Sequence, residues 1–260
     1  MIPLLAAALI SLGVQWDAVR PGLWRYESKM AASGPLAVVN AIAIRVDPAA
    51  YRFQLDLVRR DYGMRPAWTI DSIPQDGVVA VNAGQFTAGF PWGWLVRNGI
   101  EELPSGSGTL GMAFVVDSSG RVSLPTPAEI PSWQGRAVTA FQSYPTLLVD
   151  GSMPWELRAP GRGVDLAHRD SRLAVCTLAD STVVIAITRF SAFGNAGGTL
   201  PWGPTVPEMA DYMRSLGCQR AMLLDGGVSS QLAVRADDGT LSRWTNWRAV
   251  PLGLVIALRR

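Results

Sequence analysis

The chain has 260 residues, of which 48% are hydrophobic and 17% are charged. An average soluble domain has about 25% charged residues, so this composition indicates a compact protein with a sizeable core and excludes a disordered chain. A formal net charge of +2, without a lysine/arginine run, argues against nucleic acid or a membrane surface as the partner.

The first element in chain order is an apolar run from Leu4 to Leu12. It is too short to span a bilayer and has the length of the hydrophobic part of a secretory signal. No positive charge precedes the run and no clear small-x-small cleavage site follows it, so a docked N-terminal segment is the alternative. We expect a signal or apolar segment over residues 1–20, one domain over residues 21–260, no stable membrane span, and export to the periplasm or the cell exterior.

Strand patterns occupy much of the remaining chain. Half-buried strands alternate apolar and polar residues, and buried strands read as short apolar runs. An Asn-Gly pair between short flanks marks a hairpin turn, which places one at Asn98-Gly99. The predicted single strands are 51–58, 78–81 and 248–258. Residues 112–124 and 172–188 are each predicted as a strand–turn–strand unit.

The clearest helix signal lies within residues 203–218. Thr205 and Glu208 have the spacing of a capping box, an apolar face follows with helical periodicity, and Gly217 is a good stop. Because helices are scarce, we expect an α+β fold, with a single strand-rich domain of twisted, mostly antiparallel or mixed sheets and a few packed helices.

The two cysteines, Cys176 and Cys218, both lie in apolar segments. In an exported protein they would form one disulfide, and two buried thiols are equally compatible with the sequence. Two cysteines and one histidine do not make a zinc site. No dense ligand cluster identifies a metal, so no cofactor is certain, although acidic side chains near the motifs leave a divalent cation open.

Three segments place polar groups at the ends of buried strands beside glycines. Asn82 and Gly84 follow the first of these strands, Arg172 enters the second, and Asp225 leaves the strand at 221–224 and precedes Gly226-Gly227. Each segment alone is typical of an ordinary turn.

In combination these segments resemble the phosphodiester glycosidase family, which includes the lysosomal uncovering enzyme. That family has N-G-G-F-F, R-T-A-I-G, a helix that opens with G-x-T, and L-D-G-G-G-S-S. In the same order this chain has NAGQF (82–86), RLAVC (172–176), GPTVPEMADYM (203–213) and LDGGVSS (224–230). SYPTLLVDG (143–151) is also similar to the family's G-Y-P-x-L-V-x-x-G, so the resemblance covers roughly residues 36–258.

The chain departs from the family pattern at a few motif positions. Ala83 and Gln85 replace a glycine and an aromatic residue, and Val228 replaces the third glycine of the last motif. The family's D-G-R appears as TRF (188–190), which makes Arg189 a loose counterpart.

The resemblance implies hydrolysis of a sugar-1-phosphodiester in an envelope or extracellular glycan. Bond breaking at an anomeric carbon passes through an oxocarbenium-like state, usually flanked by two carboxylates. The phosphate leaving group is already a stable anion, so strong general-acid help is less necessary. His168 falls on no motif position, and we interpret it as structural or solvated.

The resemblance also suggests roles for individual residues. Asp225 is the best carboxylate, as nucleophile or base, and its alternative is a turn aspartate. Arg172 would bind the phosphate with its fork of donors, unless it is a surface arginine. Glu208 is the second acid, although the capping box already explains it. The predicted substrate-binding residues are Asn82 for a sugar hydroxyl, Gly226 and Gly227 as an anion nest, Ser229 and Ser230 as hydrogen-bonding groups, and Gly84 and Thr205.

Tryptophans near the motifs can also stack on sugar rings, although most tryptophans are core residues. Trp92 and Trp94 follow the Asn82 segment, and Trp202 precedes the helix. The whole hypothesis requires Arg172 and Asp225 to hold opposite ends of one glycosyl phosphate. The alternatives are a carbohydrate- or phosphoglycan-binding module of the same fold without turnover, and a structural envelope protein if the two side chains lie far apart.

Overall fold

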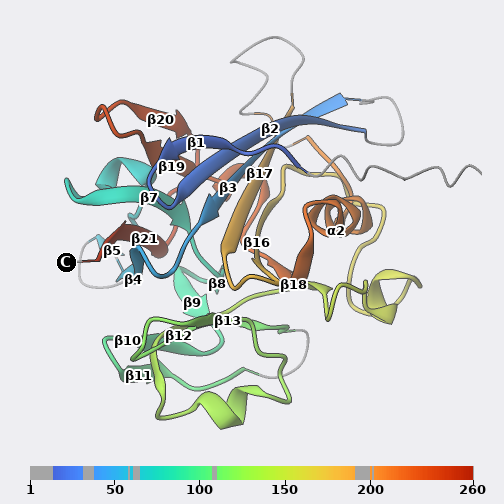
Figure 1. The fold of residues 1–260 in the computed structure, drawn as a ribbon. Helices are drawn as coiled ribbons and strands as arrows, with labels where there is room; N and C mark the ends of the chain where they lie inside the picture. The colour runs from blue at the N-terminus through green and yellow to red at the C-terminus, as the bar shows by residue number, and fades with distance from the viewer. Residues whose placement is uncertain are drawn as a thin grey trace, which may run out of the picture.

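The computed structural model describes residues 14–31, 38–57, 59–60, 65–106, 110–190, 200 and 202–259 (Figure 1). The prediction of a strand-rich domain is confirmed. The expectation of a few packed helices is corrected by the structure. The described residues contain one α-helix, α2 (Val206–Ser215), and short 3-10 segments. The fold is therefore mostly β. The 3-10 segments are η1 (Ile70–Ser72), η2 (Ile130–Trp133), η3 (Trp155–Leu157) and η4 (Gly227–Ser229).

The largest sheet, here called sheet A, runs through the middle of the molecule, and all its neighbouring strands are antiparallel (Figure 1). It combines strands from the beginning of the chain with strands from its second half. In spatial order they are β1 (Asp17–Arg20), β2 (Leu23–Ala31), β3 (Val38–Val46), β17 (Val183–Phe190), β16 (Leu173–Leu178), β18 (Cys218–Leu223) and β15 (Thr146–Leu148).

Two further five-stranded antiparallel sheets, sheets B and C, pack against sheet A. Sheet B has the order β20 (Leu241–Trp244), β19 (Leu232–Arg235), β7 (Gly77–Asn82), β21 (Leu252–Leu258) and β4 (Tyr51–Leu57). Sheet C has the order β11 (Ile100–Leu103), β10 (Leu95–Arg97), β14 (Ala137–Gln142), β12 (Ala113–Asp117) and β13 (Val122–Ser123). The two-stranded ribbons are β5 (Arg59–Arg60) with β6 (Arg65–Pro66), and β8 (Gln85–Thr87) with β9 (Phe90–Trp92).

Sheet A has a hydrophobic core on each face, because successive side chains of a strand point to opposite faces. On β17, Val183 and Ile185 belong to the core shared with sheets B and C, whereas Val184 and Ala186 belong to the core shared with α2. Every residue of β17 is consequently buried. Such two-sided burial explains why the strand reads as a continuous apolar run.

Several local predictions are confirmed. Asn98 and Gly99 have positive φ angles of 53° and 77° and connect β10 to β11, as an Asn-Gly hairpin turn requires. The capping box is present at the start of α2. The Thr205 side chain accepts a hydrogen bond from the Glu208 amide, and the Glu208 side chain accepts one from the Thr205 amide.

The strands over residues 17–46 were not predicted, although they supply three strands of sheet A.

The predicted N-terminal segment and the cysteine pair have different outcomes. Residues 1–13 of the predicted 1–20 segment lie outside the described residues, and Asp17–Arg20 form β1. None of the described helices is long and apolar enough to cross a membrane. Cys176 and Cys218 form a disulfide that joins β16 to β18, which decides between the two alternatives for these residues.

Candidate active site

Three motif segments meet where strands of sheets A and B end. The Asp225 amide donates to the Gly84 carbonyl at 3.1 Å, and the Gly227 amide donates to the Ser171 carbonyl at 2.8 Å. Because β16 and β18 are antiparallel, with Ala174 opposite Leu223, the start of one strand lies beside the end of the other. The segments around residues 84, 171 and 225 thus lie side by side.

The glycines after Asp225 are required by packing against the 170–171 segment. A Cβ atom on Gly226 would lie 2.7 Å from the Ser171 carbonyl oxygen. Gly227 has a φ of +57°, and a Cβ there would lie 2.5 Å from Asp170 Oδ2. A side chain at either position would separate the two segments. These glycines therefore bring Asp170 close to the Asp225 loop.

Asn82 and Ser230 hold the Asp225 loop in place through hydrogen bonds. Asn82 has no exposed surface. Its Nδ2 donates to the Asp225 carbonyl at 2.7 Å, and its Oδ1 accepts from the Gln231 amide at 2.8 Å. Ser230 is equally buried, and its hydroxyl bonds with the Ser171 hydroxyl and the Gly227 carbonyl. Both residues position the loop through buried hydrogen bonds, which are costly to remove.

Asp225 is the carboxylate at the centre of the site. Its Oδ2 is buried and has no hydrogen-bond partner in the described part of the chain. Burial raises the pKa of Asp225 to about 6, the nearby charge of Asp170 adds to this rise, and the Ser229 hydroxyl and Arg248 oppose it. A buried carboxylate with a raised pKa in a polar site is a recognised mark of a functional group.

Asp170 is a second carboxylate that the sequence analysis did not select. Burial raises its pKa, while Arg172, the Ser171 amide and His168 act in the opposite direction. His168 Nε2 lies 3.5 Å from Asp170 Oδ2. Asp170 falls on no family motif position and lies two residues before Arg172, in the segment that leads into β16.

Arg172 is oriented differently from the prediction. Its Nε donates to the Pro204 carbonyl at 3.1 Å, and its Nη2 donates to the His168 carbonyl at 2.5 Å. Burial lowers its pKa, and the carboxylates that counteract this are Asp170 and Asp165. Asp170 interacts with both Arg172 and Asp225, so it links the two residues that were expected to face each other directly.

Arg248 supplies an exposed cation beside Asp225. Its charge acts on the Asp225 carboxylate, and its guanidinium carbon lies 4.8 Å from the centroid of the Phe86 ring. The Arg248 amide also donates to the Val228 carbonyl at 3.1 Å, which fixes this part of the chain over the motif. Nothing in the sequence around Arg248 marks it, because its loop reaches the site only in the folded chain.

Arg189, the loose counterpart of a family arginine, is a buried cation near these segments. It is 7% exposed, and burial lowers its pKa to about 10. Its Nη2 donates to the Thr245 carbonyl, in the loop that carries Arg248. Its Nη1 is buried without a hydrogen-bond partner among the described residues. Arg189 thereby supports the loop that supplies Arg248.

Glu208 and Thr205 are engaged at the start of α2. Both carboxylate oxygens of Glu208 pair with Arg169, at 2.9 and 3.0 Å, and Oε2 also accepts from the Thr205 amide at 2.9 Å. The Thr205 hydroxyl accepts from the Glu208 amide at 3.3 Å. These contacts favour the capping alternative for Glu208, and Asp170 is better placed as the partner of Asp225.

The remaining predicted residues divide between surface and core. Trp94 is 1% exposed, so a stacking role is wrong for it, whereas Trp92 and Trp202 are exposed. The His168 side chain is largely exposed and contacts Asp170, while its backbone carbonyl accepts from Arg172. In the described ranges no three histidine, cysteine, aspartate or glutamate side chains are grouped as a metal site.

The fold resembles solved structures of several proteins. A zebrafish N-acetylglucosamine-1-phosphodiester α-N-acetylglucosaminidase catalytic domain, auto-inhibited by its pro-peptide, matches with a TM-score of 0.68 and 18% identity, over 94% of this chain and 86% of that one. A hypothetical protein from Synechocystis matches with a TM-score of 0.58 and 16% identity, over 92% of this chain and 62% of that one. A Burkholderia pseudomallei protein that is assigned as exported matches with a TM-score of 0.61 and 14% identity, over 88% of this chain and 76% of that one. No curated protein sequence gives a match.

These likenesses define the fold of the chain. The family model of phosphodiester glycosidases matches residues 75–257, which include both carboxylates and every predicted site residue. The chain belongs to the phosphodiester glycosidase family.

Proposed function

We propose that this protein is a hydrolase that releases a sugar from a sugar-1-phosphodiester in an envelope or extracellular glycan. The observation that carries the proposal is the state of Asp225. This family-motif carboxylate has a buried oxygen without a partner in the described chain, a pKa raised to about 6, and a second carboxylate beside it.

The two carboxylates match what the reaction needs. The bond between the anomeric carbon and the bridging oxygen breaks, and its electron pair leaves with the phosphomonoester. The oxygen of a water molecule forms the new bond to that carbon, and a carboxylate accepts the proton that the water loses. In the proposal Asp225 and Asp170 are these carboxylates, and they stabilise the positive charge that develops on the sugar.

The phosphate requires a cation, and Arg248 is proposed for this role. Its guanidinium is exposed, lies beside Asp225 and is oriented by the Phe86 ring. A guanidinium offers a planar fork of donors that matches phosphate oxygens. Arg172 then becomes a positioning residue, because its donors hold the Pro204 and His168 carbonyls and its charge faces Asp170.

Export is part of the proposal. Disulfides persist in oxidising compartments, and the Cys176–Cys218 disulfide meets that condition. The likeness to a protein assigned as exported points in the same direction.

The test uses aryl phosphodiesters of N-acetylglucosamine, glucose and galactose 1-phosphate, with free sugar and aryl phosphate as the measured products. Wild-type protein should release sugar from at least one of them. Asp225→Asn should lower the rate by about 10³-fold while ligand binding persists. Arg248→Ala should raise KM about tenfold, whereas Arg243→Ala, which removes an exposed arginine of β20 that pairs with Asp71, should change little.

Two outcomes would overturn this assignment. Full activity of Asp225→Asn would remove the carboxylate from the chemistry. Binding of the diesters by wild-type protein without release of sugar would identify a phosphoglycan-binding module of the same fold.

A further inference from the structure

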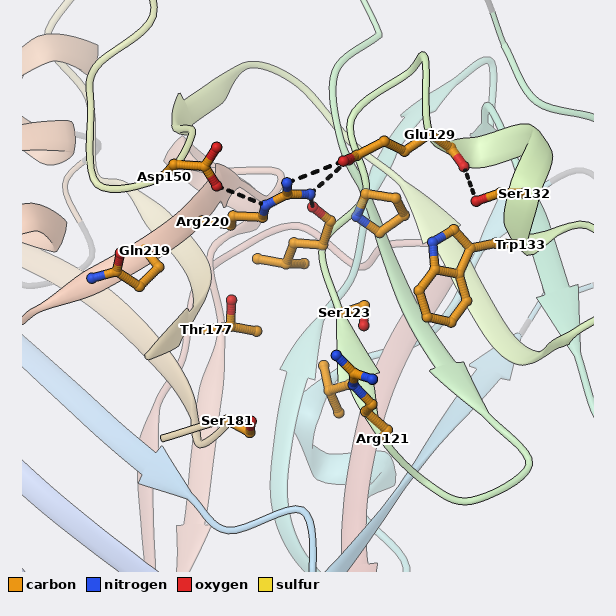
Figure 2. A pocket seen from close by; sticks show the side chains of 13 residues that line it. Arg121, Ser123, Glu129, Ser132, Trp133, Asp150, Thr177, Ser181, Gln219 and Arg220 are labelled. Atoms are coloured by element: carbon orange, nitrogen blue, oxygen red, sulfur yellow. Dashed lines mark hydrogen bonds and ion pairs between the residues drawn. The ribbon is translucent and has the colours of Figure 1, made fainter. Parts of the chain in front are cut away.

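Away from the Asp225 site, a hollow of about 400 Å³ lies where sheet C meets sheet A. It is lined by the β13–η2 segment on one side and by strands β16 and β18 on the other, and we call it the Trp133 hollow (Figure 2). Gln219, which lines it, lies near the start of β18, whereas Asp225 follows the end of that strand. The hollow is therefore separate from the candidate active site.

Arg121 is an unpaired cation in the wall of the Trp133 hollow. Its guanidinium makes no hydrogen bond or ion pair within the described part of the chain. Figure 2 shows Arg121 and Ser123 on one wall, with Thr177 and Ser181 on the facing wall. The hydroxyl groups of these three residues also have no partner among the described residues. Polar groups that converge from two walls on one space are typical of a ligand site.

The other charged groups lie at the opposite end of the hollow (Figure 2). Arg220 donates to both carboxylate oxygens of Glu129, at 2.6 and 3.1 Å, and to Asp150 at 3.3 Å. One guanidinium thus faces two carboxylates, so this end of the hollow is acidic and accepts hydrogen bonds. A ligand that fits the hollow places a negative group at Arg121 and neutral hydrogen-bond donors at the Asp150 end.

Trp133 adds an aromatic wall to these polar groups. The guanidinium carbon of Arg136 lies 4.9 Å from the centroid of its ring, which helps to hold the indole in place. C–H groups of a pyranose ring pack on an indole, and its hydroxyl groups donate to carboxylates. A guanidinium binds a carboxylate or phosphate group through two parallel hydrogen bonds. The walls of the hollow thus match a pyranose ring that carries one anionic substituent.

A second hollow, of about 510 Å³, adjoins the Trp133 hollow at Arg121. The two share three lining residues, Arg121, Val122 and Ser181. Arg259 also lines the second hollow, so we call it the Arg259 hollow. An anionic group at Arg121 lies where the two hollows meet, and a glycan longer than one sugar has room to continue into the Arg259 hollow.

The charges of the Arg259 hollow leave Arg121 available to a ligand. Two acids line this hollow, Asp47 and Asp180. Asp180 pairs with Arg45. Asp47 accepts from the Ala49 amide at 2.8 Å, and its charge is matched in number by that of Arg259.

We propose that the Trp133 hollow binds an acidic glycan, with one pyranose ring on Trp133 and the carboxylate or phosphate group of that sugar on Arg121. The adjoining part of the glycan lies in the Arg259 hollow. This binding site is separate from the reaction at Asp225, and it does not depend on the proposed function.

The test is isothermal titration calorimetry with two matched pairs of sugars. Tetragalacturonic acid is compared with its neutral methyl ester, and trehalose 6-phosphate is compared with trehalose. Wild-type protein should bind at least one acidic sugar about tenfold more tightly than its neutral partner, because charge-assisted hydrogen bonds are the strong ones. The pair that shows this difference identifies the substituent as a carboxylate or a phosphate group.

The variants locate the binding site. Arg121→Ala and Trp133→Ala should each weaken binding of the acidic sugar by about tenfold. Thr177→Val, which removes one hydroxyl group at nearly constant volume, should weaken it by about threefold. Arg214→Ala is the matched control, since it removes an exposed arginine of α2 that lines neither hollow. Arg248→Ala tests the candidate active site as the binding site, and both of these variants should bind as the wild type does.

Several outcomes would refute this inference. Neither acidic sugar binds, each neutral sugar binds as tightly as its acidic partner, or Arg121→Ala binds as the wild type does. Equal losses in Arg121→Ala and Arg214→Ala would show attraction to the overall charge instead of a site. A loss in Arg248→Ala alone would place the ligand at the candidate active site. Hydrolysis of the aryl diesters should be unchanged in Arg121→Ala, so the failure of this inference and the failure of the proposed function are distinct results.

Discussion

Strand β18 has a carboxylate near each of its ends, and the two have opposite electrostatic surroundings. Beside Arg220, the Glu129 carboxylate accepts hydrogen bonds from a guanidinium, which lowers its pKa to about 2. Beyond Leu223, burial raises the pKa of Asp225 to about 6. The surroundings of Glu129 stabilise its ionised form, whereas the surroundings of Asp225 raise the free energy of its ionised form.

Under the proposed function, this difference separates a structural region from a reactive one. At the Arg220 end, Arg220 pairs with both Glu129 and Asp150, and a disulfide joins the strands. At the Asp225 end, a buried oxygen lacks a partner within the described chain, and two carboxylates lie close together. We therefore expect changes at the Arg220 end to lower stability, and changes at the Asp225 end to lower turnover while increasing stability at neutral pH.

The largest expected effect is that of the disulfide. Replacing both Cys176 and Cys218 by alanine should lower the free energy of unfolding by about 4 kcal/mol, because the bond closes a separation of 42 residues. Urea unfolding measures this change, and reduced wild-type protein is the control. An unchanged midpoint in both samples would mean that this end of β18 does not depend on the covalent link.

The second effect concerns the coupling of the two carboxylates. Asp170→Asn should reduce diester hydrolysis by about 100-fold, equivalent to about 3 kcal/mol. It should also lower the pKa of Asp225, since the Asp170 charge contributes to raising it. The acidic limb of the pH–rate profile should move to lower pH. Asp165→Asn is the control, because Asp165 also faces Arg172 but is exposed and does not act on Asp225.

The third effect is a pH-dependent gain in stability. The pKa of Asp225 is about 6 in the folded chain and about 3.9 when unfolded, so wild-type stability falls as pH rises through this window. Asp225→Asn removes this loss and should stabilise the protein at pH 7 relative to pH 4 by about 2 kcal/mol. Melting temperatures measure the difference, and an identical mutant-minus-wild-type value at both pH values would contradict the assigned pKa.

The smallest effect is at Glu129, where the sign is opposite. Its folded pKa of about 2 lies below the ordinary value, so its contribution is present at neutral pH and is lost as pH falls toward 2. Because the side chain is 43% exposed, Glu129→Gln should cost only about 1 kcal/mol at pH 7. Asp211→Asn, in an exposed pair with Arg214, should cost less. Equal losses would show that the Glu129 contacts are no stronger than a surface pair.

Much of the local structure is predictable from the sequence, because local structure depends on near neighbours. The Asn98-Gly99 turn, the capping box at Thr205 and Glu208, and the final strand all follow from short patterns. The strand ends at Asn82 and before Asp225 were also identified. The described residues contain fewer helices than expected, since pattern alone does not show that three sheets cover most of the core.

The roles of the site residues required the tertiary structure. The sequence offers Asp225 as the best carboxylate and Glu208 as a second acid that a capping box also explains. In the fold, Arg169, 39 residues away, binds Glu208, and burial removes Asp225 from water. Arg248 reaches Asp225 only because its loop crosses the motif.

The sequence by itself determined several strands, the turns and the family motif, because each is encoded by residues close together in the chain. The tertiary structure alone decided which carboxylate is buried and which cation lies beside it. Desolvation and charge interactions act through space, so a pKa depends on groups that are distant in the sequence.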